Sequence, residues 1–140
     1  MFIRFLRFFF FGKRGDQFAQ TAIVLPVVML ATMGLFDMTM AGFASVNANN
    51  AANYGARVGS VTQRGAGSAA YAAALTSISH AAVGDYTVSV SGGGFPGAQI
   101  NVDVTWEVPN HMATITTIWG GTGNTDLGGT SAATFRQEGW

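Results

Sequence analysis

The most pronounced pattern in the chain is a run without charged side chains at residues 17–36. A helix that rises about 1.5 Å per residue spans about 30 Å over such a run, which matches the hydrocarbon core of a bilayer. Pro26 lies inside the run and removes one backbone donor, a defect that membrane helices tolerate. A chain of 140 residues has little else with which to cover this segment as a buried helix. We therefore predict a transmembrane helix at 16–37.

A helical pattern continues after the apolar run. One set of residues recurs at spacings of three and four, as in a helix that buries one face. Its members are Ala44, Ala48, Ala51, Tyr54, Val58 and Val61. Asn49, Asn53, Arg57 and Ser60 fall on the opposite face. The pattern predicts a helical spine at 38–64, with this stripe as the seam that faces the core.

The remaining segment, 65–140, mixes helical and strand patterns. Alanine-rich residues 68–82 predict a second helix. Alternation of apolar and polar residues at 86–91 and 100–108 predicts two strands, joined by a glycine-rich turn into an antiparallel hairpin. Residues 120–129 predict a loop, and 130–136 predict a last strand. The expected fold class is α+β: a long membrane-spanning helix continues into a spine that packs on a small antiparallel sheet.

The distribution of charge indicates a topology. Only 10% of the residues are charged and the formal net charge is zero, so no global field attracts nucleic acid. The cations of the leader all precede the first acid, Asp16: Arg4, Arg7, Lys13 and Arg14. Cations flank the cytoplasmic end of a membrane helix. We therefore expect a cytoplasmic N-terminus and an extracytoplasmic domain from about Asp37.

Candidate chemistry is sparse. The two histidines, His80 and His111, show no metal-ligand spacing, and both are expected to be solvated surface residues. The glycine-rich stretches lack the Gly-Lys-Ser/Thr ending of a phosphate loop. The chain has no cysteine, so disulfides and thiolate sites are excluded. We expect no catalytic residues, no metal and no cofactor.

Short motifs in a characteristic order carry a family resemblance. They are Arg14-Gly15 before FAQTAIVLP, then NAANYGARVGS at 50–60, VDVTWEVP at 102–109 and ATFRQE at 133–138. Together they resemble the TadE-like proteins of the tight-adherence (Flp) pilus assembly system, which are pseudopilins. The resemblance implies a pilin-like protein that is inserted in the membrane.

The resemblance also implies processing. Gly15 resembles the residue before a prepilin-peptidase cut, which would release the leader 1–15 and leave Asp16 first. The fifth mature residue would be Gln20, where pilin-like proteins have glutamate. A glutamate carboxylate can form an ion pair with the N-terminal amine of a neighbouring subunit, whereas the neutral amide of Gln20 can only hydrogen-bond. Two alternatives stay open: an unprocessed turn at the membrane interface, and a secretory signal peptide cut near Ala44.

These observations predict a minor structural or assembly component of a surface pilus. The expected location is the inner membrane, with a single span and possible presence in a cell-surface pilus. The expected partners are inner-membrane lipid, other pilin or pseudopilin subunits, pilus-assembly membrane proteins and the prepilin peptidase. Candidate assembly and helix-packing residues are Gln20, Pro26, Ala51, Tyr54 and Val58. The rivals are a single-span binding module that never enters a filament and, as a third reading, a secreted hydrolase.

Overall fold

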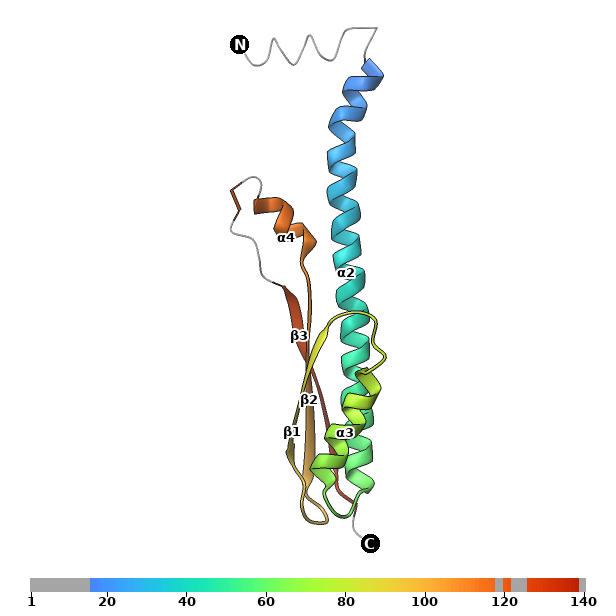
Figure 1. Ribbon diagram of the computed structural model, residues 1–140, viewed down its shortest axis with the longest axis vertical. Helices are drawn as coiled ribbons and strands as arrows, with labels where there is room; N and C mark the ends of the chain where they lie inside the picture. Colours follow the sequence, from blue (N-terminus) through green and yellow to red (C-terminus); the bar gives the residue numbers. More distant parts are fainter. Residues whose placement is uncertain (1–15, 118–119, 122–125, 139–140) are drawn as a thin grey trace. The chain divides into compact units, whose positions relative to one another are not determined.

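The computed structural model describes residues 16–117, 120–121 and 126–138. The chain divides into two compact units, Met1–Phe36 and Asp37–Trp140. One helix, α2 (Asp16–Val61), belongs to both (Figure 1). It is followed by α3 (Ala66–Ile78), β1 (Asp85–Gly92), β2 (Gln99–Val108), α4 (His111–Thr116) and β3 (Leu127–Arg136). The expected α+β fold class is confirmed.

In the first unit, α2 is apolar on every side. Most large side chains here are at least half exposed, with Phe18 and Leu35 at 86% and 67%, whereas Leu30 and Met33 are partly buried. The helix continues through Pro26 without interruption. Thr32 satisfies its own hydroxyl by donating to the carbonyl of Val28 at 2.8 Å. α2 is therefore long and apolar enough to cross a membrane, and a helix that is apolar all round suits a lipid environment.

In the second unit, three antiparallel strands form one sheet in the order β1-β2-β3. The β1–β2 turn needs glycine, because Gly92, Gly93, Gly94 and Gly97 all have positive φ. β3 begins at Leu127, inside the segment expected to be a loop. Gly129 explains the difference, since a Cβ there would lie 2.9 Å from the indole of Trp106 on the paired strand. This glycine makes room for a neighbouring side chain and does not end the strand.

The core joins small residues on two helices to large ones on the sheet. Ile100, Val102 and Val104 of β2 are fully buried and, with Val108, are the largest fully buried side chains. α2 and α3 contribute alanines and glycines. A Cβ on Gly55 would lie 2.8 Å from the carbonyl oxygen of Ala70 and 2.9 Å from the Cβ of Ala74. The two helices therefore approach closely because small residues line their contact.

The predicted core-facing seam is right at its start and wrong further along α2. Ala44, Ala48 and Ala51 are fully buried, as expected, but Tyr54 is 52% exposed and Val61 is 49% exposed. Val58 is half-buried. The buried positions in this region are instead Ala52, Gly55, Ala56, Gly59 and Ser60. The pattern misled because it favoured large apolar residues, whereas the close contact with α3 admits only small ones.

Candidate functional site

The start of α2 holds the predicted processing site. Gly15 lies outside the described residues, and Asp16 is the first residue of the helix. Gln20 and Pro26 are both exposed. Exposure at these two positions leaves them available to another molecule, and their proposed assembly role stays a prediction.

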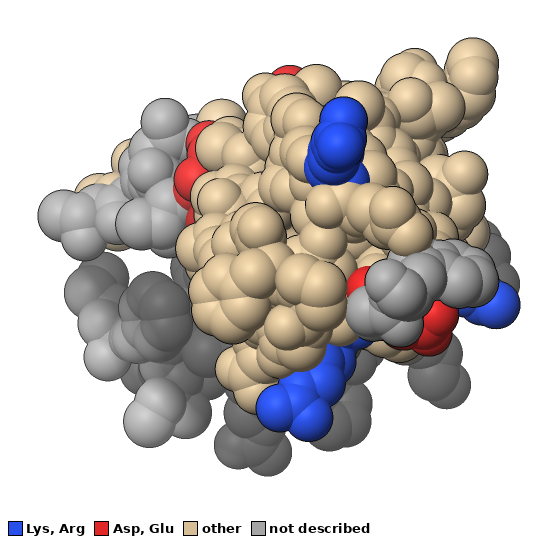
Figure 2. All heavy atoms as spheres, turned by 90° about the horizontal axis from the view of Figure 1, so that it is seen from below, with Lys and Arg blue, Asp and Glu red and all other residues tan. Residues whose placement is uncertain are grey.

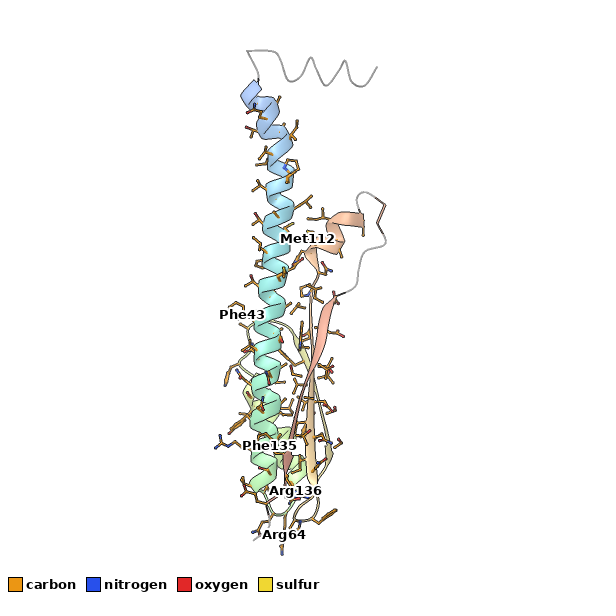
Figure 3. All side chains as sticks on the ribbon, turned by 180° about the vertical axis from the view of Figure 1, so that it is seen from behind. Phe43, Arg64, Met112, Phe135 and Arg136 are labelled. Atoms are coloured by element: carbon orange, nitrogen blue, oxygen red, sulfur yellow. The ribbon has the colours of Figure 1, made fainter. Side chains whose placement is uncertain are left out.

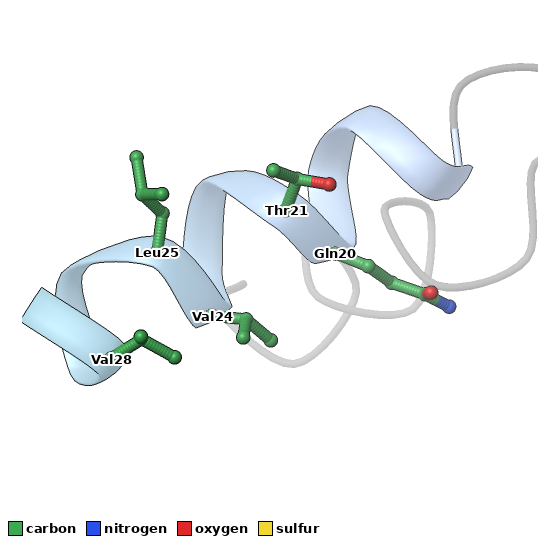
Figure 4. A pocket seen from close by; sticks show the side chains of 5 residues that line it. All are labelled: Gln20, Thr21, Val24, Leu25 and Val28. Carbon is green, nitrogen blue, oxygen red and sulfur yellow. The ribbon is translucent and has the colours of Figure 1, made fainter.

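A pocket lies along the same turns of α2. Its lining residues are Gln20, Thr21, Val24, Leu25 and Val28. All of them come from one helix (Figure 4). Only Gln20 and Thr21 bring polar groups, and neither side chain titrates near neutral pH. The described part of the lining is therefore a surface for apolar contact with one hydrogen-bonding end.

In the second unit, α2 also presents apolar side chains on the face opposite its buried alanines. Phe43, Val46, Tyr54 and Val61 form this outer ridge, with exposed fractions of 61%, 57%, 52% and 49%. Successive members are separated by whole helical turns, so they share one side of the helix. Phe43 projects from the side of α2 that faces away from the sheet (Figure 3). Asn50 and Arg57 are exposed on the same side, so the ridge is a mixed stripe in which separate apolar side chains alternate with polar ones. A neighbouring helix can cover such a stripe.

A buried carboxylate links α2 to the connection between β2 and β3. Asp37 is only 3% exposed. Its Oδ2 accepts the backbone N–H of Met112 at 2.8 Å, and its Oδ1 lies 2.7 Å from Nδ1 of His111. Burial of a charge is tolerated here because hydrogen bonds compensate it on both oxygens. The contact fixes the first turn of α4 beside residue 37 of α2.

Sequence reasoning missed both α4 and this contact. His111 was expected to be a solvated surface histidine; its side chain is 44% exposed, but its ring also contacts Asp37, which was not expected. The available signal for the helix was Asn110 after Pro109, since Asn is a favoured N-cap. The Asn110 side chain accepts the N–H of Ala113 at 2.9 Å. The pairing of residues 37 and 111 had no local signal, because it joins positions far apart in the chain.

The described residues offer no grouping of three or more His, Cys, Asp or Glu side chains that could hold a metal ion. His80 is exposed. On the side of the molecule that Figure 2 shows, Lys, Arg, Asp and Glu side chains of the described residues are isolated spots among uncharged residues.

Comparison with known proteins finds a family match over most of α2. The family model described as TadE-like protein matches residues 17–57. No curated protein and no solved structure matches the chain. The match confirms the resemblance to TadE-like proteins of the tight-adherence system. With the apolar helix, it fits a single-pass membrane protein associated with the Tad pilus. TadE-like proteins are structural pilus components and are not known as enzymes.

Proposed function

We propose that this chain is a pilin-like structural or assembly component of a surface pilus. The observation that carries the proposal is the family match at 17–57, which covers the apolar run and continues onto the helix that supports the sheet. The chain thus combines a membrane segment with an extracytoplasmic spine on one helix. Other pilin or pseudopilin subunits and pilus-assembly membrane proteins are its proposed partners.

The proposed topology follows from charge. Arg4, Arg7, Lys13 and Arg14 precede the apolar run, and no Lys or Arg follows until Arg57. The excess of cations keeps the N-terminus in the cytoplasm. The unit Asp37–Trp140 then lies outside the inner membrane.

The proposed processing step is removal of residues 1–15 by a prepilin peptidase. Support comes from Gly15, whose lack of a side chain gives an enzyme access to the backbone, and from the basic residues that precede it and the apolar run that follows it. Protein purified from its native membrane should begin at Asp16 by N-terminal sequencing. The variant Gly15→Leu should keep its leader, because a branched side chain obstructs the cut. A wild-type protein that begins at Met1 contradicts this step.

The outer ridge is the proposed contact with neighbouring subunits. Its large side chains are exposed in the isolated chain, while the opposite face of the same helix is already occupied. Helices that assemble side by side bury such a stripe. A chain without native cysteines allows a direct test.

In native membranes, Tyr54→Cys should form disulfide cross-links to a second copy or to partner subunits that carry a matching cysteine. Thr87→Cys, on the exposed face of β1, is the control and should not cross-link. Equal cross-linking of both variants would show that the outer ridge is not the contact with neighbouring subunits.

A second candidate, a membrane-anchored binding module, is favoured by the β1–β2 turn. Phe95 at its tip is 67% exposed. The turn is held by buried Gln137, whose Oε1 accepts the N–H of Gly94 at 3.1 Å and whose Nε2 donates to the carbonyl of Thr62 at 2.9 Å. A rigid turn that presents an aromatic side chain suits ligand binding. An intact N-terminus, together with loss of ligand binding in Phe95→Ala, would favour this candidate.

A further inference from the structure

The connection between β2 and β3 has an unusual composition. β2 ends at Val108 and β3 begins at Leu127, and residues 109–125 between them contain no Asp, Glu, Lys or Arg; Asp126 follows directly before β3. In ordinary soluble domains about a quarter of the residues are charged, and loops lie on the surface. A stretch of this length without these four residue types is therefore suited to an environment less polar than bulk water.

The structure shows where α4, the helix within this connection, lies. Asp37 holds α4 through Met112 N–H at 2.8 Å and His111 Nδ1 at 2.7 Å. Figure 3 shows Met112 next to α2, as these contacts require. These two hydrogen bonds link α4 to Asp37, and Asp37 directly follows the charge-free run 17–36.

The position of Asp37 has a consequence for the membrane. If the run 17–36 crosses the hydrocarbon core, residue 37 emerges at the level of the lipid headgroups. α4 is then held at the same level. Its Met112 and Ile115 are only half-buried by the described residues, while Thr114 and Thr117 are exposed. An element with apolar groups and hydroxyls, whose one titratable side chain is hydrogen-bonded to Asp37, can enter this region at little desolvation cost.

We infer that α4 is a membrane-interface element: it rests on the outer surface of the lipid bilayer and is held there by Asp37. The contact is apolar and not electrostatic, because α4 contains no Lys or Arg. It differs in this respect from a basic amphipathic helix, whose binding depends on anionic lipid. Neutral phosphatidylcholine vesicles are therefore sufficient for the contact, and added salt does not weaken it.

This inference rests on the proposed insertion of residues 17–36, so the test must read the two separately. The full chain without native cysteines can carry one labelled cysteine at a time. Thr114→Cys places an environment-sensitive dye on an exposed position of α4, and Ser89→Cys places it on the exposed face of β1 as a matched control. Val24→Cys reports insertion of the apolar run.

In phosphatidylcholine vesicles that contain nitroxide-labelled lipid, the fluorescence of the dyes at residues 24 and 114 should be quenched, and their emission should shift to shorter wavelengths. The dye at residue 89 should show neither quenching nor an emission shift. Adding Asp37→Ala to the Thr114→Cys variant should reduce quenching at residue 114 and leave quenching at residue 24 unchanged. If the dye at residue 24 is quenched but the dye at residue 114 is quenched no more than the control dye at residue 89, the inference is overturned while insertion of the apolar run stands. Absence of quenching at both 24 and 114 overturns insertion as well. If the emission of the dye at residue 114 shifts to shorter wavelengths in native membranes but not in vesicles, α4 contacts a protein partner, and this result also overturns the inference.

Discussion

The two faces of α2 in the second unit differ in a way that reverses the usual arrangement. The buried face carries Ala48, Ala52 and Ala56, each with no exposed surface, whereas the outer ridge carries Phe43 and Tyr54 with more than half of their surface exposed. A surface helix normally buries its large apolar residues. Here small residues bring α2 close to α3 and the sheet, and the large residues remain for contacts outside the chain.

The first unit shows that this division is local. There α2 exposes large apolar side chains such as Phe18, Val27 and Leu35 and buries almost nothing. One helix therefore has three kinds of surface: exposed apolar side chains around its first part, a tight protein contact on one side of its second part, and an exposed ridge on the other. The following predictions test whether the two sides of the second part are as different in energy as they are in geometry.

The largest expected effect separates a buried large residue from one on the ridge. Ile100→Ala removes a fully buried side chain and should lower the free energy of unfolding by about 2–5 kcal/mol. Tyr54→Ala removes a larger side chain that is half exposed, and its effect should stay within about 1 kcal/mol. Thermal unfolding of the full chain in detergent measures both. Equal destabilisation would show that the ridge belongs to the fold.

A second test compares two glycines of α2. Gly55→Ala introduces a Cβ that meets Ala70 and Ala74 at less than van der Waals distance, and such overpacking costs about 1–3 kcal/mol. Gly42→Ala meets nothing within 4 Å and should gain about 1 kcal/mol of helix propensity. Because both variants share the propensity gain, the difference between their unfolding free energies isolates the close contact. A difference near zero would mean that α2 and α3 are not tightly packed.

Much of the fold could be predicted from periodicity. Alternation over 100–108 predicted the central strand, and the structure has Gln99–Val108. The charge-free run and the pattern after it predicted a helix that continues beyond the membrane, and α2 runs to Val61. These signals are local, because the spacing of apolar residues within one helix or strand indicates which of its faces is buried.

The errors have a common physical cause. Tyr54 has the spacing of a core residue, but the side of α2 that is buried packs closely on α3, and this contact has room only for small side chains. Gly129 looks like a loop residue, but it serves the indole of Trp106 on another strand. The contact between Asp37 and His111 joins distant segments. Each of these features is set by a tertiary partner, which periodicity within one element does not report.

The smallest of the expected effects concerns Asp37, the residue where the two environments of α2 meet. Asp37→Asn keeps the shape of the side chain but replaces one acceptor oxygen with a donor, next to the N–H of Met112 and the ring of His111. Hydrogen bonds to a charged group contribute about 1.5–3 kcal/mol and neutral ones about 0.5–1.5 kcal/mol, so the loss should be about 1 kcal/mol. Asp103→Asn, on the solvent face of β2, is the matched control and should stay within about 0.5 kcal/mol. Amide hydrogen exchange should locate the effect, since the N–H of Met112 should exchange faster in Asp37→Asn while amides of β2 keep their rates. Unchanged exchange at Met112 would mean that Asp37 does not hold α4, and α4 would then lose its fixed place beside the end of the apolar run.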